Sequence, residues 1–243
     1  MINSKGIETW QLEKIMDGRP LVILAALNEE AGIGPTLAEL RACVGQSSFL
    51  VVDGRSTDST VKIAAEMGAE VVTQKGSGKG NAIAAGITHA KFFQGQYVVF
   101  IDADYTYPAT HVPEMINILE KNPDVGMVCG NRLPDHRSLS AMHDIFYLGN
   151  RLLAFTHNLL NGVDLQDPLT GLRTVRWQII KNWKPESKGF DVEVELNHYV
   201  ERKGFGILEV PIYYRQRLGE KKLKLRHGFT ILRRILLETL QTT

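Results

Sequence analysis

Short apolar runs alternate with segments of helical character along the first half of the chain. The runs are rich in residues that favour buried strands, and they are Leu21 to Leu27, Phe49 to Asp53, Ala69 to Gln74, Tyr97 to Asp104 and Val125 to Asn131. Between them, stretches such as GPTLAELRACV and DSTVKIAAEMGA place apolar residues at helical intervals. This alternation predicts an α/β fold in which helices flank a mostly parallel sheet.

The ends of these expected strands carry polar residues suited to chemistry. Asn28, Asp53, Lys79 and Asp102 each fall at or just after a strand's carboxyl end. In an open parallel sheet these ends gather at one edge, where ligands bind. The pattern therefore predicts a binding site along this edge of the sheet.

The pattern changes after about residue 132. A polar loop, RLPDHRSLSAMHD, is followed by a helical segment from His143 to Leu160 and then by a second set of short elements. The chain has no internal repeat and no low-complexity linker. We therefore expect a single domain over residues 1–243, in which the second half shapes a second binding surface.

Size and composition narrow the class of protein. A chain of 243 residues with 44% hydrophobic content can bury a large core. Its net charge of +1 gives no support to a nucleic-acid partner. Cys43 and Cys129 are expected to be buried free thiols, which suits a reducing cytoplasm. Because the N-terminus lacks a signal-peptide core and no stretch is long enough to span a bilayer, we expect a soluble or peripheral protein.

The aspartates of the DAD sequence are the first candidates for chemistry. Aspartate is common at strand ends because it favours turns, so Asp102 and Asp104 could simply end the strand. The strand's period of two instead predicts that both carboxylates point to the same side, where they can share a hard cation.

Two further motifs follow the first two strands. LNEE places Asn28 and Glu29 at a helix entry, where acidic residues are favoured by the helix dipole as well as by function. In VVDGRSTDST, Asp53 ends a strand, and Ser56 or Thr57 is expected to cap a helix that begins near Asp58. Asp53 would then be available to accept hydrogen bonds from a ribose or a nucleobase.

The stretch QKGSGKGNAIAAG combines glycines with Lys75 and Lys79 before a helix. This composition is typical of a loop that approaches a phosphate or a sugar. The spacing matches neither GxxxxGK[ST] nor GxGxxG, so the sequence disfavours a phosphate-loop ATPase and a dinucleotide-dependent dehydrogenase.

Taken together, LNEE, DGRSTDST, GKGNAI and DAD resemble the family 2 glycosyltransferases of the GT-A fold. The resemblance implies that residues of about 20–131 bind a nucleotide sugar, that about 132–243 bind the acceptor, and that Asp102 and Asp104 hold Mg²⁺ or Mn²⁺ against the donor diphosphate. The donor-binding residues that it implies are Ala25, Leu27, Glu29, Asp53, Lys79, Asp102, Ala103, Asp104, Arg217 and Lys222.

The second half is similar to the polyprenyl-phosphate branch of that family, which contains the dolichyl-phosphate mannose and glucose synthases and archaeal enzymes of N-glycosylation. The motifs that carry this likeness are GNR, DPLTGLR, GFDVEVEL and EVPIYYRQRLGEKKLK. The likeness implies an inverting glycosyltransferase that moves a sugar to dolichyl or another polyprenyl phosphate for protein glycosylation. Thr106 stands where mannose synthases commonly carry glutamine, which favours a UDP-sugar donor over GDP-mannose.

Cationic residues of this half are expected to bind phosphate. Arg132 is the candidate catalytic residue beside the two aspartates, because it matches a family position that binds phosphate. Arg137 and Arg173 extend the acceptor-phosphate site on the strength of their forked donors. Because a phosphate monoester is already ionised at neutral pH, no general base is required. Asp191, Glu193 and Glu195 of FDVEVE are therefore expected to be structural or to contact the sugar, and no catalytic role is assigned to them.

The C-terminus predicts how the protein meets a membrane. Between Arg215 and Arg234 there are eight basic residues and one acidic residue. The apolar residues of the last helix share one face, with Arg233 and Arg234 off it, and they are Phe229, Leu232, Ile235, Leu236 and Leu240. A basic amphipathic helix suits peripheral attachment to the inner face of the cell membrane, whereas a helix packed on the sheet would show the same pattern.

Two other functions stay open on the sequence. One is a family 2 glycosyltransferase with a water-soluble acceptor. The other is a catalytically silent subunit that binds a nucleotide sugar, although the intact Asp102 and Asp104 argue against it.

Overall fold

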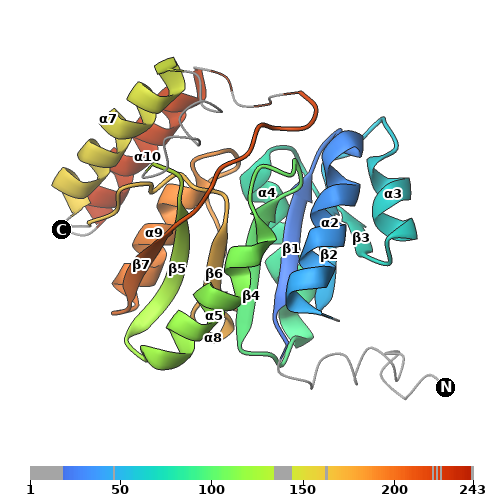
Figure 1. Cartoon of the computed structure of the whole chain (residues 1–243). Helices are drawn as coiled ribbons and strands as arrows, with labels where there is room; N and C mark the ends of the chain where they lie inside the picture. Colours follow the sequence, from blue (N-terminus) through green and yellow to red (C-terminus); the bar gives the residue numbers. More distant parts are fainter. Residues whose placement is uncertain are drawn as a thin grey trace.

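A seven-stranded sheet with strand order β3-β2-β1-β4-β6-β5-β7 forms the centre of the molecule (Figure 1). The computed structural model describes residues 19–45, 47–133, 144–161, 164–220, 222, 224 and 226–241. The strands are β1 (Leu21–Ala26), β2 (Ser48–Asp53), β3 (Glu70–Thr73), β4 (Tyr97–Asp102), β5 (Val125–Asn131), β6 (Arg173–Arg176) and β7 (Gly206–Pro211).

The sheet is mostly parallel, as the alternation of strands and helices predicts. Strands β1 to β4 are mutually parallel, and β5 runs parallel to β7. Only β6 is antiparallel to its neighbours β4 and β5. All five apolar runs form strands, and the sheet also takes in β6 and β7 from the second half of the chain.

Helices cover both faces of the sheet. They are α2 (Glu30–Val44), α3 (Thr60–Glu66), α4 (Lys79–His89), α5 (Val112–Lys121), α7 (Asp144–Asn161), α8 (Trp177–Ile180), α9 (Val192–Arg202) and α10 (Arg226–Gln241), with short 3₁₀ turns η1 (Ala90–Phe92) and η2 (Ala109–His111). Helix α3 starts later than the sequence pattern predicts, because Asp58 rather than Ser56 or Thr57 accepts a hydrogen bond from the backbone N–H of Thr60, at 3.0 Å.

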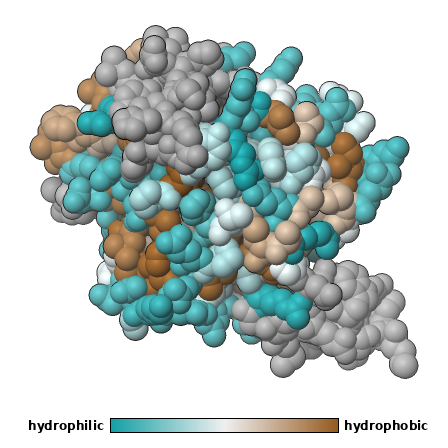
Figure 2. Space-filling model, viewed as in Figure 1, coloured by the Kyte–Doolittle hydropathy of each residue, from teal (hydrophilic) through white to brown (hydrophobic). Residues whose placement is uncertain are grey.

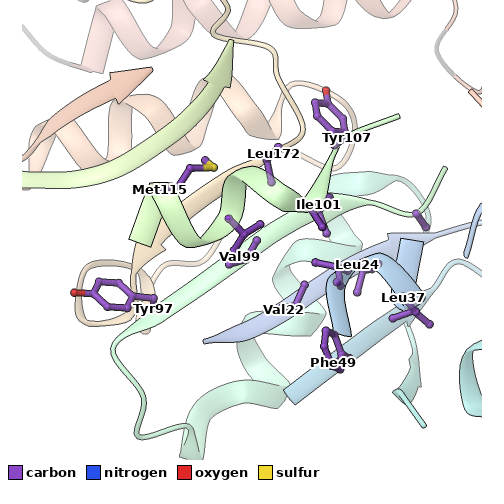
Figure 3. Close-up of a cluster of buried hydrophobic side chains, with 14 of the residues drawn as sticks. Val22, Leu24, Leu37, Phe49, Tyr97, Val99, Ile101, Tyr107, Met115 and Leu172 are labelled. Atoms are coloured by element: carbon purple, nitrogen blue, oxygen red, sulfur yellow. The ribbon is translucent and has the colours of Figure 1, made fainter. Parts of the chain in front are cut away.

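Alternate residues of each central strand fill two separate cores. On β1, Val22 and Leu24 pack toward α2 and α5, and Figure 3 shows this core with Leu37 and Met115. Ile23 packs on the other face, against α4 and α9. Each fully buried aliphatic side chain contributes roughly 1.5–3 kcal/mol, so both faces hold the sheet in place under its carboxyl edge.

Helices α7 and α10 lie side by side beyond this sheet (Figure 1). They are joined to α9 by a small cluster of Val194, Ile231 and Ile235, with Leu153 and Leu169 against it. None of the helices that the structure describes is both long and apolar enough to cross a membrane. Cys43 and Cys129 are free thiols, and burial raises the pKa of Cys129 to about 11.

Candidate active site

A cavity of about 680 Å³ opens at the carboxyl ends of β1 and β4. Most of the residues that the sequence proposes for the donor and the catalytic site line it together. These are Ala25, Leu27, Glu29, Lys79, Asp102, Ala103, Asp104, Arg132, Arg217 and Lys222. Residues far apart in the sequence therefore share one space.

The two aspartates reach this cavity by different backbone conformations. Strand β4 ends at Asp102, and Asp104 lies in the following turn, where Tyr105 has a φ of +65°. The sequence predicts that the side chains of Asp102 and Asp104 point to the same side of one strand, but the strand ends before Asp104. A carboxylate oxygen of Asp104 accepts hydrogen bonds from the backbone N–H and the hydroxyl of Thr106, at 3.1 and 2.5 Å. Burial and the nearby Asp102 carboxylate raise the pKa of Asp104, and Arg217 opposes this effect.

Lys79 lies between carboxylates from two halves of the chain. Its ammonium nitrogen is 2.5 Å from Asp102 Oδ1 and 2.7 Å from Glu193 Oε1. Burial alone would lower the pKa of Lys79, but these two carboxylates raise it above its ordinary value. The other carboxylate oxygen of Glu193 is buried and has no hydrogen-bond partner among the described residues. Glu193, to which the sequence assigned no role, therefore belongs to the site.

Arg217 forms a second cationic contact with the carboxylates. Its guanidinium pairs with Asp104 and with Glu29. The backbone N–H of Leu218 donates to Asp104 O at 3.2 Å, which fixes the segment against the aspartate loop. Burial raises the pKa of Glu29 to about 7, with Arg217 opposing and Asp104 reinforcing the shift. Lys222 donates to the carbonyl of Asn28, at 3.1 Å.

The two motifs after β1 and β2 hold each other in place. Asn28, with a φ of +50°, receives a hydrogen bond from the Thr57 backbone N–H at 2.8 Å, and Ser56 Oγ accepts one from the Asn28 N–H at 2.8 Å. The Asp53 carboxylate accepts the backbone N–H groups of Arg55 and Ser56. Asp53 is buried and is not among the residues that line the cavity, although its neighbour Gly54 is.

The glycines of the GKG motif allow the start of α4 to lie in close contact with residues 187–189. A Cβ at Gly80 would lie 2.0 Å from the carbonyl oxygen of Ser187, and one at Gly78 would lie 2.3 Å from that of Lys188. The backbone N–H of Gly80 donates to Lys188 O at 3.0 Å. The N–H of Gly80 at the start of α4 is therefore occupied by chain, whereas Gly78 and Lys79 line the cavity, where the sequence expects this loop to approach a ligand.

Arg132 is a buried cation in the cavity wall. Asp167 binds it in a bidentate pair, at 2.6 Å to Nε and 2.7 Å to Nη2, and the guanidinium carbon lies 5.2 Å from the centre of the Tyr214 ring. Glu209 in turn accepts the backbone N–H of Asp167 at 2.7 Å. Burial opposes the charge of Arg132, but Asp167 raises its pKa well above the ordinary value.

Arg173 does not lie in the acceptor-phosphate site, where the sequence predicts it. It is 2% exposed, and it donates to Thr170 O, Pro168 O and Asn197 Oδ1 at 2.9, 2.6 and 2.5 Å. It does not line the main cavity. These contacts use its forked donors to hold the fold, which contradicts the predicted role in phosphate binding. Arg137 lies outside the described residues.

Tyr107 lines the cavity beside Asp102, and the loop that carries Gly171 packs against the same carboxylate. The Tyr107 hydroxyl accepts the backbone N–H of Gly171 at 2.7 Å. A Cβ at Gly171 would lie 2.4 Å from Asp102 Oδ2, so any other residue here would displace the Asp102 carboxylate. The sequence predicts no role for either residue, although Gly171 stands in the DPLTGLR motif and Tyr107 follows DAD. The signal available was the glycine of DPLTGLR, which marks a close approach.

The carboxylate pair fits a divalent cation. Asp102 and Asp104 both present oxygen donors to the cavity, and oxygen ligands are those that Mg²⁺ and Mn²⁺ prefer. Within the described ranges, no group of three or more acidic, histidine or cysteine side chains is arranged to hold a metal. The fit to a divalent cation therefore rests on the oxygen donors of Asp102 and Asp104.

Comparison with known proteins identifies close relations in sequence. Residues 21–182 match the family model described as glycosyl transferase family 2. The chain is 33% identical over 205 residues to a dolichyl-phosphate hexose transferase of Haloferax volcanii, covering 83% of this chain and 85% of the relative. It is 32% identical over 193 residues to the glycosyltransferase AglJ of the same organism, covering 79% of this chain and 62% of AglJ.

Solved structures share the fold. A glucosyl-3-phosphoglycerate synthase from Mycobacterium tuberculosis in complex with Mn²⁺ and UDP-glucose is 25% identical with a TM-score of 0.70, covering 97% of this chain and 83% of that protein. The same synthase in complex with Mg²⁺ and UDP gives the same TM-score. The mostly parallel sheet flanked by helices is the GT-A fold, as the sequence predicts.

Proposed function

Because this chain belongs to glycosyl transferase family 2 and is a glycosyltransferase, we propose that it moves a sugar from a nucleotide sugar to the phosphate of a polyprenyl lipid such as dolichyl phosphate. The observation that carries the proposal is a shared cavity. It joins the Asp102 and Asp104 carboxylates, suited to the donor, with the buried guanidinium of Arg132, suited to an acceptor phosphate.

The donor binds along the edge formed by β1 and β4. The nucleoside contacts Ala25, Leu27 and Ala103, which line the cavity. The negatively charged diphosphate binds the cationic side chains of Arg217 and Lys222. Glu193 lines the same cavity, and its carboxylate would suit a hydroxyl of the bound sugar. Thr106 and the UDP-glucose of the solved relative favour a UDP-sugar, with GDP-mannose as the competing donor to test.

A divalent cation, Mg²⁺ or Mn²⁺, held by Asp102 and Asp104, would neutralise charge on the departing nucleoside diphosphate. Neighbouring side chains of the protein neutralise and orient these two aspartates. Lys79 and Arg217 each neutralise one of the aspartates, at 2.5 Å for Lys79. Thr106 orients the Asp104 carboxylate through two hydrogen bonds.

Arg132 orients the acceptor. Asp167 occupies the Nε and Nη2 groups of its guanidinium, so a phosphate would bind through Nη1. The phosphate oxygen attacks the anomeric carbon of the sugar from the face opposite the leaving group, which inverts that carbon. No side chain must remove a proton, because the phosphate monoester is already ionised at neutral pH.

The surface beyond the cavity suits a membrane. Helix α7 exposes Leu152, Phe155 and Leu159, and α10 exposes Phe229 and Leu240 at 79% and 73%. Figure 2 shows hydrophobic side chains on the side where α7 and α10 lie. Exposed apolar helices with nearby basic residues bind anionic membrane surfaces. We therefore propose a cytoplasmic protein that attaches peripherally to the inner face of the cell membrane.

A soluble acceptor is the second candidate. It is favoured by the likeness to a glucosyl-3-phosphoglycerate synthase, a protein whose name describes a small phosphorylated product. Arg132 would suit the phosphate of such an acceptor equally well, so the apolar surface of α7 and α10 distinguishes the two candidates.

The test is sugar transfer from a panel of labelled UDP- and GDP-sugars to detergent-solubilised dolichyl phosphate or to a small water-soluble phosphate monoester, with Mg²⁺ or Mn²⁺ and with EDTA as the control. A metal-dependent product that extracts into organic solvent supports the proposal and names the donor. Transfer only to small phosphorylated acceptors would replace it with the second candidate. Tight donor binding without transfer to either class would point to a silent subunit.

A further inference from the structure

Arg234 occupies an unexpected position in α10. The amphipathic pattern places it on the polar side of the helix together with Arg233. In the structure Arg234 is only 8% exposed, whereas Arg233 is exposed. Burying a guanidinium is costly unless carboxylates surround it, so its neighbours must explain its place.

Four carboxylates surround Arg234. Nη1 lies 3.2 Å from Glu186 and 3.4 Å from Glu238, Nε lies 3.5 Å from Asp191, and Nη2 lies 3.9 Å from Glu195. The carboxylates of Asp191, Glu195 and Glu238 are almost fully buried. Burial lowers the pKa of Arg234, but the carboxylates more than offset this.

These carboxylates control the segment that meets the GKG motif. Glu195 accepts the backbone N–H groups of Glu186 and Ser187, at 2.8 and 2.7 Å. The next carbonyls, of Lys188 and Gly189, accept the N–H of Gly80 at 3.0 and 3.1 Å. Residues 186–189 are therefore held by the Arg234 network on one side and by the start of α4 on the other.

We propose that Arg234 is a positioning residue that keeps Lys79 on Asp102. It acts through residues 186–195, which hold both the start of α4 and Glu193, the second partner of Lys79. The inference deepens the proposed function, since it concerns the same catalytic aspartate. Without Arg234, Glu238 keeps its ion pair with Arg202 at 3.0 Å, but the buried carboxylates of Asp191 and Glu195 lose this cation and segment 186–189 loosens.

The first test measures amide hydrogen exchange in Arg234→Gln, with Arg233→Gln on the same helix as the matched control. We expect the Gly80, Asn81 and Ser187 amides to exchange about tenfold faster in Arg234→Gln, while the amides of β1 and β4 keep their rates. The control should match the parent protein. Unchanged exchange at Gly80, or equal acceleration throughout the sheet, would overturn the proposal. If Arg234→Gln does not fold, Arg234→Lys takes its place, with a smaller acceleration expected at the same amides.

The second test is a double-mutant cycle on sugar transfer. Arg234→Gln should lower kcat with little change in KM for the acceptor, and Arg234→Lys should restore part of the loss. Because both routes from Arg234 converge on the contact of Lys79 with Asp102, the double variant with Lys79→Met should be about as slow as Lys79→Met alone. Losses that multiply would contradict the proposal. The exchange experiment needs no substrate, so it decides the matter even if the proposed acceptor is wrong.

Discussion

The ammonium group of Lys79 contacts Asp102 at 2.5 Å and joins it to Glu193, which lies on a helix from the other half of the chain. Lys79→Met leaves two carboxylates without their shared cation. We expect kcat to fall by about 100-fold and the free energy of unfolding to fall by roughly 3 kcal/mol. The measurement is transfer kinetics beside urea unfolding.

The same loop provides the control for that experiment. Lys75 is exposed and carries the same charge, so Lys75→Met should keep both kcat and stability close to those of the parent protein. Equal losses in the two variants would show that the local charge, rather than the contact with Asp102, is what matters.

Asp104→Asn tests the proposed metal site. Asp104 pairs with Arg217 and accepts two hydrogen bonds from Thr106, so an amide of the same shape should leave the fold intact. We expect transfer to fall by roughly 100-fold or more, as it should in the parent protein with EDTA. Asp124→Asn, an exposed aspartate, is the control. Near-normal turnover of Asp104→Asn with Mg²⁺ or Mn²⁺ present would sink the assignment.

Asp167→Asn tests whether Arg132 is oriented for the acceptor. The asparagine keeps one acceptor oxygen where Asp167 offers two, at 2.6 and 2.7 Å from the guanidinium. We expect KM for dolichyl phosphate to rise by about tenfold or more while donor affinity changes little, because the loss of one charge-assisted hydrogen bond costs about 1.5–3 kcal/mol. Asp164→Asn, at the surface nearby, should behave as the parent. A loss confined to donor affinity would reassign Arg132 to the donor.

The strands were the most predictable part of the fold. A buried parallel strand is a run of apolar residues, and β5 coincides with the predicted run Val125 to Asn131. Strand β6, RTVR, lacks that signal because Arg173 and Arg176 begin and end it. Their guanidiniums are satisfied by carbonyl groups, such as Pro168 O for Arg173 and Val125 O for Arg176, and no local pattern announces these partners.

The site residues that directly follow strand ends could be predicted from the sequence. Those whose hydrogen-bond or ion-pair partners lie far away along the chain were harder to predict. Asp102 and Lys79 were found because their motifs have local signatures. Asp167 and Glu193 stand in motifs that the sequence analysis quoted, but their partners Arg132 and Lys79 come from other parts of the chain. The glycines of GKG were interpreted as a close approach to a phosphate or a sugar, whereas Gly80 makes a close approach to the Ser187 carbonyl, and both kinds of approach need the same residue.

Gly80→Ala measures the cost of that close approach. An added Cβ would lie 2.0 Å from the Ser187 carbonyl oxygen, so the two segments must separate. We expect the free energy of unfolding to fall by about 1–3 kcal/mol. We also expect kcat to fall, because the change would displace the adjacent residue Lys79 from Asp102. Gly149→Ala, a helical glycine whose added Cβ meets none of the described atoms within 4 Å, is the control and should be neutral or stabilising. Equal stability of the two variants would contradict the packing role.

A buried histidine pair predicts the acid sensitivity of the fold. His157 on α7 and His198 on α9 have ring centres 5.1 Å apart. Burial lowers the pKa of His157 to about 4, with Arg173 adding to the effect, and burial, His157 and Arg202 lower the pKa of His198 to about 3.

Both histidines therefore destabilise the folded state as the pH falls. Between a pH of about 6.5 and these lower pKa values, the unfolded chain binds more protons than the folded one, so the free energy of unfolding decreases with acidification. Each histidine contributes at most about 1.4 kcal/mol per pH unit. Urea unfolding at pH 7.5 and pH 5 should show a smaller decrease for His198→Leu than for the parent protein, since one of the two groups no longer titrates. A decrease of the same size in both proteins would assign the acid sensitivity to other groups.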